Sequence, residues 1–281
     1  MPTNRRPFGY AQACTELAEV TGMGAVFAGS LGYTGFIGSK AWQARGNLTA
    51  IDLVQEIKRG LLDLLFPPRC VSCRERGSVL CAECLDAFEL IEPPLCPRCG
   101  RPRPNGRLCP LCQRDPLRID GVRAVAYFDG TLREAIHHFK YYNRQALAVP
   151  LGRLMGDYWE RSPIPAEIIV PVPLHPDRLR ERGYNQATLL ARELGKSIGL
   201  PVAEKGLARV RATRPQVELG AQERRENVRD AFRCSNAELK GKRILLIDDV
   251  CTTGATLEAC SIALRQVGAR SVWAFTLARA R

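Results

Sequence analysis

From residue 121 onward, short apolar runs alternate with amphipathic segments. The apolar runs have strand length and lie at 122–128, 168–174, 205–210, 244–247 and 272–277. Between them, apolar residues recur at helical spacing at 131–142, 147–159, 185–198 and 255–267. Strands that alternate with helices of this length are typical of an open, mainly parallel sheet flanked by helices. The pattern predicts an α/β domain over residues 119–281, with its ligand at the carboxyl ends of the strands.

Residues 211–230 interrupt this alternation. They are polar and charged and include Pro215, which predicts a long mobile loop. A loop of this length inside a compact domain is either functional or simply flexible. One function would be that of a lid that keeps water away from a reacting centre.

Residues 51–118 show a different pattern. A helical pattern covers residues 52–66 and ends at Pro67-Pro68. The segment Cys70–Cys112 that follows has few apolar residues, so burial of a core cannot hold it together. We therefore expect a leader helix followed by a small module that needs another source of stability.

The first 50 residues fit neither pattern. Residues 20–38 carry no charge and raise the question of a membrane span, but six glycines keep their hydropathy low. Glu16 and Glu19 precede them, unlike the basic start of a signal peptide. We expect a disordered extension, or a start codon placed too far upstream, and no stable membrane insertion.

Cysteine supplies the missing stability of the small module. Eight of the twelve cysteines form four Cys-x-x-Cys pairs, with seven residues between the first two pairs and nine between the last two. Two such pairs close a tetrahedral zinc site, so the module predicts two structural zinc ions. The gaps favour pairing in sequence order, and interleaved pairing stays open. The predicted ligands are Cys70, Cys73, Cys81, Cys84, Cys96, Cys99, Cys109 and Cys112.

Two competing interpretations of the cysteines are weaker. A thioredoxin-like redox role would need a βαβ context, which none of the four pairs has. Disulfides would need an oxidising compartment, whereas the chain shows no convincing secretory signal, so we expect a cytoplasmic, reducing location.

The net charge of +12 is compatible with nucleic acid or phosphorylated metabolites as partners.

The stretch Arg243–Thr256 carries the clearest chemistry. Two acids, Asp248 and Asp249, end an apolar run, and a hydroxyl- and glycine-rich turn leads from them into a helix. The stretch resembles the phosphoribosyl-pyrophosphate (PRPP) motif of type I phosphoribosyltransferases at every position. The acids would accept from the ribose hydroxyls and serve as catalytic residues, and the turn would donate to the 5′-phosphate. The expected PRPP contacts here are Asp248, Asp249, Cys251, Thr252, Thr253, Gly254, Ala255 and Thr256.

A generic Mg²⁺-binding acid pair, as in some NTPases or receiver domains, is the alternative for these acids. Such pairs do not run straight into Thr-Thr-Gly-Ala-Thr, which favours PRPP or ribose 5-phosphate as the ligand. A second basic segment, 170–186, would hold the pyrophosphate through Arg178, Arg182 and Gly183. The alternative there is a solvated basic start of a helix. His175 lies in the same segment, and we assign it no catalytic role.

The chain as a whole resembles the competence protein F (ComF) family from Leu61 to its end. The resemblance rests on the leader before Cys70, the four cysteine pairs, Phe139-Lys-Tyr141 and the PRPP motif. The other matching positions are Pro171–His175, Arg182–Gln186, Thr213, Gln216, Leu219, Glu223-Arg224 and Asn227-Val228.

The resemblance implies a type I phosphoribosyltransferase-like fold behind a double zinc ribbon, PRPP with Mg²⁺ as ligand, and a role in DNA uptake. Single-stranded DNA and a DNA-uptake helicase are the partners it implies. Two functions stay open: phosphoribosyl transfer with release of pyrophosphate, and a non-catalytic adaptor that senses PRPP and handles single-stranded DNA. Sparse aromatic residues, 7% of the chain, weaken base stacking but leave electrostatic contact with DNA open.

Overall fold

The computed structural model describes residues 67–212 and 221–281. The extension at 1–50, the leader helix predicted at 52–66 and the part of the predicted loop at 213–220 lie outside these ranges. Among the helices of the described residues, none combines the length and the apolar character that a membrane crossing requires.

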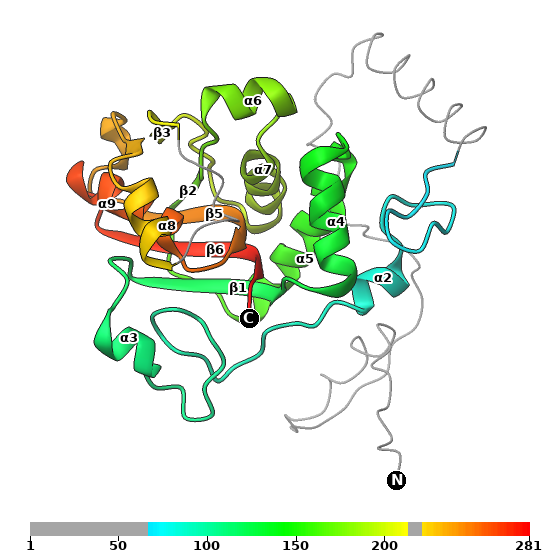
Figure 1. Cartoon of the computed structure of the whole chain (residues 1–281), viewed down its shortest axis with the longest axis horizontal. Coiled ribbons are helices and arrows are strands. Elements are labelled where there is room, and N and C mark those ends of the chain that lie inside the picture. Colours follow the sequence, from blue (N-terminus) through cyan, green and yellow to red (C-terminus); the bar gives the residue numbers. More distant parts are fainter. Residues whose placement is uncertain (1–66, 213–220) are drawn as a thin grey trace, which may run out of the picture. The chain divides into compact units, whose positions relative to one another are not determined.

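The centre of the protein is a sheet of four parallel strands (Figure 1). Its order across the sheet is β1, β6, β5, β2, so the last strand of the chain lies next to the first. In register, Leu246 of β5 pairs with Val170 on one side and with Ala274 on the other. The α/β fold predicted from the alternating pattern is confirmed. The strands are β1 Gly121–Tyr127, β2 Ile168–Pro171, β5 Arg243–Cys251 and β6 Ser271–Arg279.

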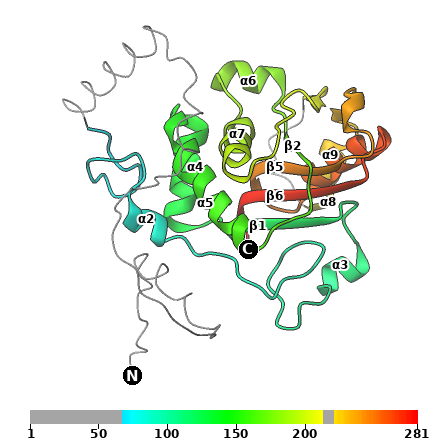
Figure 2. The same ribbon diagram turned by 180° about the vertical axis from the view of Figure 1, so that it is seen from behind.

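Helices cover both faces of this sheet (Figures 1 and 2). One face carries α4 Gly130–Tyr141, α5 Ala148–Arg161 and α7 Gln186–Ile198, and the other carries α8 Ala221–Val228 and α9 Ala255–Gln266. Shorter helices complete the description: α2 Ala82–Asp86, α3 Pro110–Arg114, η1 Gln145–Leu147, α6 Pro176–Arg182 and η3 Ala237–Leu239.

Side chains that alternate along the strands build two separate cores. Leu245 and Ile247 pack with the helices α4, α5 and α7, whereas Ile244 and Leu246 pack with α9. Successive side chains of a strand point to opposite faces, so a central strand needs apolar residues at every position. This explains the unbroken apolar run before the two acids.

The two cysteine-rich segments join different cores. The first ribbon, Cys70–Cys84, packs with the core of α4 and α5, and Ser72 Oγ donates to Glu134 on α4 at 2.7 Å. The second ribbon, Cys96–Cys112, packs with the core of α9. The chain between them runs along β1, where the N–H of Ile91 donates to the carbonyl oxygen of Val125 at 2.8 Å. This contact covers an otherwise open edge of the sheet.

Three predicted elements differ from the structure. The strand predicted to end at Ile247 continues to Cys251, because its last residues still pair with β6. The strand predicted at 168–174 ends at Pro171, because Pro171 and Pro173 have no N–H group to donate to a ladder. The strand predicted at 205–210 shrinks to β3, Ala208–Arg209.

That short strand also lies outside the main sheet. It pairs antiparallel with β4, Phe232–Arg233, which no sequence pattern indicated. The prediction of a loop at 211–230 is wrong for the eight residues of α8. Gln, Glu and Arg are good helix formers, so their intrinsic propensity favours this helix. The prediction relied on apolar periodicity, and this polar segment has no apolar stripe.

Candidate functional site

Asp248 and Asp249 lie where the sheet changes width. β2 pairs with β5 only as far as Ile247, whereas β6 continues beside both acids. The acids therefore sit on a strand that has lost one neighbour. Asp249 is buried and Asp248 half-buried, and the N–H of Asp249 donates to Oδ1 of Asp248 at 2.9 Å.

Each acid is matched by a cation from a different element. Lys140, in the last turn of α4, brings its Nζ to 2.9 Å from Oδ1 of Asp249. Arg209 of β3 interacts electrostatically with Asp248. We assigned no role to either cation from the sequence. Lys140 lies in the Phe139-Lys-Tyr141 match to the ComF family, but nothing in the sequence placed it opposite an aspartate more than a hundred residues later.

The environment of Asp248 favours its neutral form. Burial, together with the adjacent charge of Asp249, raises the pKa of Asp248 to about 7, although Lys140 and Arg209 oppose this rise. A carboxyl group with a pKa close to neutral can accept from a hydroxyl group and can give up its proton when a cation arrives.

The turn after β5 has the form of an anion-binding helix start. Gly254 caps α9 with a left-handed backbone, φ +86°, and Thr253 Oγ1 accepts from the N–H of Ala255 at 3.3 Å. Among the described residues, no backbone carbonyl accepts from the N–H groups of Thr252, Thr253 or Gly254. These donors and the positive end of the helix dipole face the same turn. The structure thus brings the predicted contacts from Asp248 to Thr256 together in one segment.

The predicted pyrophosphate contacts in the segment around α6 differ in their surroundings. Arg178 and Arg180 are exposed and pair with acids on the same helix, as a solvated helix start would. Gly183 ends α6 with φ +80°, and its N–H already donates to the carbonyl oxygen of Leu179 at 2.8 Å. Of the three predicted contacts, Arg178 and Gly183 thus already have partners within this helix.

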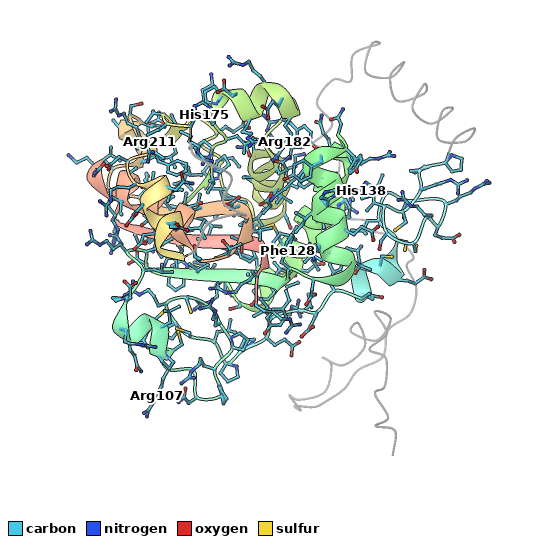
Figure 3. The ribbon with its side chains drawn as sticks, viewed as in Figure 1. Arg107, Phe128, His138, His175, Arg182 and Arg211 are labelled. Carbon is cyan, nitrogen blue, oxygen red and sulfur yellow. The ribbon has the colours of Figure 1, made fainter. Side chains whose placement is uncertain are left out.

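Arg182 is different, because it reaches away from α6 toward the end of α4 (Figure 3). Its Nη1 donates to Oε1 of Gln186 at 2.6 Å, and its guanidinium lies 5.3 Å from the ring centre of Tyr141. Tyr141 and Tyr142 are exposed, whereas Tyr184 is buried and donates to the carbonyl oxygen of Phe139. Arg182 is thus half-buried and lies beside the last turn of α4, the helix that also carries Lys140.

The eight cysteines of the ribbons gather in two groups of four, in sequence order. Within each group all sulfur atoms lie within 4.8 Å of one another. Sγ of Cys73 lies 3.5 Å from Sγ of Cys81, and Sγ of Cys99 lies 3.7 Å from Sγ of Cys109. A tetrahedral site with Zn–S bonds of about 2.3 Å needs sulfur atoms about 3.8 Å apart, so both groups fit zinc.

Backbone N–H donors stabilise the thiolate form of one cysteine in each group. Burial alone would raise the pKa of Cys70, but N–H groups of Cys81, Cys73 and Ser72 outweigh it and lower that pKa to about 6. In the second group the pKa of Cys96 is lowered to about 6 in the same way. Thiolates are the form that binds zinc. With four sulfur ligands each, neither site leaves an open position for catalysis.

Known proteins show the same two parts. Residues 61–113 match the family model of the double zinc ribbon domain, and residues 179–281 match that of the phosphoribosyl transferase domain. The glutamine PRPP amidotransferase of B. subtilis, complexed with ADP and GMP, is 20% identical over 50% of this chain and 30% of that chain, with a TM-score of 0.36. A TM-score this low supports no argument about the fold.

Three curated relatives cover most of the chain. Competence protein F of Haemophilus influenzae is 32% identical over 76% of this chain and 98% of that protein. DNA utilization protein YhgH of Escherichia coli K12 is 30% identical over 77% of this chain and 99% of its own. Competence protein ComFC of Bacillus subtilis is 29% identical over 71% of this chain and 84% of its own. Because nearly the whole Haemophilus protein is matched at this identity, the chain belongs to the competence protein F family.

Proposed function

We propose that this protein binds PRPP at the carboxyl end of β5. The turn Thr252–Thr256 receives the 5′-phosphate, and the acids Asp248 and Asp249 accept from the ribose hydroxyls. Arg182 is the side chain of the α6 segment best placed to approach the pyrophosphate. Mg²⁺ that arrives with the pyrophosphate would relieve the repulsion between the two carboxylates.

The observation that carries this proposal is the adjacency of the acids to the start of α9. Two carboxylates, each matched by a cation, lead within three residues into a turn whose N–H groups have no backbone acceptor among the residues that the structure describes. A phosphate and a polyol joined in one molecule need this combination of donors and acceptors at this separation along a chain. The match to a phosphoribosyl transferase family model supports the same ligand.

The site also supports transfer of the phosphoribosyl group. A nucleophile would form a bond to the anomeric carbon while the bond from that carbon to pyrophosphate breaks, and the electron pair would leave with pyrophosphate. Asp248 and Asp249 would hold the ribose and stabilise the positive charge that develops on its ring. Positioning and charge stabilisation would supply most of the acceleration.

The test is binding of PRPP to the Asp248→Asn/Asp249→Asn variant by calorimetry. We expect affinity to fall at least about tenfold, since each Asn keeps the shape but loses the charge. The control is Asp157→Asn/Glu160→Gln, which changes the same charges at exposed positions of α5. Unchanged affinity in the site variant, with an intact melting transition, would remove these acids from the ligand site.

A second function has its own supporting observation. The rings of Tyr141 and Tyr142 are exposed, and the guanidinium of Arg182 lies 5.3 Å from the ring centre of Tyr141. Stacking rings with a nearby cation suit single-stranded DNA. In this adaptor function, PRPP is sensed and not consumed, and a DNA-uptake helicase would be the protein partner.

Two measurements separate the functions. Pyrophosphate release from PRPP with a panel of nucleobases and amines, abolished in Asp248→Asn/Asp249→Asn, would establish transfer. Salt-dependent binding of single-stranded DNA that survives this variant but is lost in Tyr141→Ala/Tyr142→Ala would establish the adaptor.

A further inference from the structure

The side chain of Arg279 is a buried charge that lacks an acidic partner. Arg279 is the last residue of β6 and is 2% exposed. Within the described part of the chain, no carboxylate forms an ion pair with it, and its Nε has no hydrogen-bond partner. A buried guanidinium without a counter-charge is costly, so a negative group must lie nearby.

The groups around this guanidinium are sulfur atoms. Nη1 of Arg279 lies 3.6 Å from Sγ of Cys251, its partner across the sheet. The guanidinium also interacts electrostatically with Cys99 of the second ribbon, and Cys99 belongs to the same buried core as Cys251. Arg279 is therefore close both to the four-cysteine group of that ribbon and to the end of β5.

The second cysteine group needs such a neighbour, and the first does not. All four cysteines of the second group are buried, whereas Cys73 of the first is exposed and Cys81 half-buried. Four thiolates outweigh the charge of one Zn²⁺, so a loaded group is negative. Water can screen that charge at the first group but not at the second.

We propose that Arg279 is the buried counter-charge of the second zinc site and connects that site to the phosphate-binding turn through Cys251. The counter-charge role does not depend on PRPP binding. The effect on the turn rests on the proposed PRPP function.

Further contacts tie the second ribbon to the same turn. Leu117, five residues after Cys112, lies so close to Gly254 that an added Cβ there would be 3.2 Å from its Cδ1. The N–H of Arg118 donates to Glu258 on α9 at 2.7 Å. Leu117 and Arg118, in the segment that follows the ribbon, thus contact the turn and the helix after it. Binding at the turn and zinc retention in this ribbon should therefore strengthen each other.

The first test is zinc release to a chromogenic chelator. We expect the wild-type protein to release both of its zinc ions slowly. Arg279→Met keeps the bulk and removes the charge, so one of the two ions should leave about 10–100 times faster, as when an outer-shell partner of a metal site is lost. Arg279→Lys should restore slow release. Arg281→Met is the matched control, because Arg281 lies two residues away and pairs at the surface with Glu89 and Asp129.

Release of both ions from Arg279→Met at the wild-type rate would overturn the counter-charge. If that variant does not fold, the comparison of Arg279→Lys with Arg281→Met carries the test, and a rate for Arg279→Lys far above that of the control would count against the proposal.

The second test uses the wild-type protein alone. Saturating PRPP should slow the release of one zinc ion severalfold and leave the other unchanged. Equal rates with PRPP bound would overturn the link to the turn. If calorimetry shows that PRPP does not bind at all, the proposed function fails, while the release rates of the Arg279 variants still decide the counter-charge.

Discussion

At the scale of residues, the candidate site is a balance of charges that only the folded chain can assemble. Asp249 is matched by Lys140 from α4, and Asp248 by Arg209 from a short strand outside the main sheet. Burial still dominates at Asp248, whose pKa is raised to about 7. The protein keeps a carboxyl group that costs stability at neutral pH, which is common where a side chain serves a ligand.

This cost can be measured as a pH dependence. An aspartate in the unfolded chain titrates near pH 3.8, well below the pKa of about 7 in the folded protein. Between these values the folded state binds more protons, so the free energy of unfolding falls as pH rises. We expect Asp248→Asn to gain stability over the wild type between about pH 4 and pH 8, by on the order of 1–4 kcal/mol.

Denaturant unfolding at several pH values measures this gain. For Asp157→Asn, at an exposed position of α5, the free energy of unfolding should change with pH in parallel with that of the wild type. Parallel curves for Asp248→Asn as well would mean that the carboxyl group of Asp248 is not perturbed in the folded state.

At the scale of elements, two turns have the same backbone handedness and different surroundings. Gly183 after α6 and Gly254 before α9 both have positive φ, +80° and +86°. A Cβ at Gly183 would meet open space, whereas one at Gly254 would press on Leu117. Gly183 is required only by its backbone conformation, whereas Gly254 is also required by the close contact with Leu117, which follows the second ribbon.

Alanine at these two positions separates the two demands. Gly183→Ala should cost about 1–2 kcal/mol, the strain of a left-handed backbone. Gly254→Ala should cost more, because Leu117 must also move, and it should weaken PRPP binding. Thermal unfolding and calorimetry measure both effects. An equal loss of stability in the two variants would show that Leu117 yields without cost.

Elements also show what the sequence could predict. The four main strands and the long helices followed from apolar periodicity, and the zinc sites from the spacing of cysteines. Helix α8 was missed because polar helices have no stripe, and β3 with β4 because two-residue strands have no period. The partners of the acids, Lys140 and Arg209, were out of reach because their positions depend on how distant elements pack.

At the scale of the whole molecule, the double zinc ribbon is part of the sheet's surroundings and not a separate appendage. The first ribbon joins the core of α4 and α5, and the second joins the core of α9. Gly100 in the second ribbon approaches β1 so closely that a Cβ would lie 2.2 Å from the carbonyl oxygen of Val122. Zinc bound by the ribbons would therefore support more than the ribbons themselves.

The zinc content follows from this arrangement. Protein purified without chelator should contain about two zinc ions per chain by elemental analysis. Removing both should lower the melting temperature of the α/β domain as well, because each ribbon contributes to one of its cores. A metal-free protein with an unchanged melting temperature would contradict both statements.

A single methyl group tests the contact between the second ribbon and β1. Gly100→Ala should unfold more easily than Gly77→Ala by about 1–3 kcal/mol. Both glycines have positive φ, but a Cβ at Gly77 in the first ribbon meets nothing within 4 Å. Gly100→Ala should also lose zinc from the second site first. Equal stability of the two variants would mean that the ribbon can shift along the strand.

The strand order determines how long β1 waits for its partner strand during synthesis. β1 pairs only with β6 in the main sheet, and β6 lies 144 residues further on, counted from Tyr127 to Ser271. At about 5–20 residues per second, β1 leaves the ribosome roughly 7–30 s before its partner. The segment from Glu89 to Ile91 pairs with the opposite edge of β1 and is made before it. The chain between the ribbons can thus shield one of the two edges of the nascent strand from aggregation, while the edge that β6 will occupy stays open.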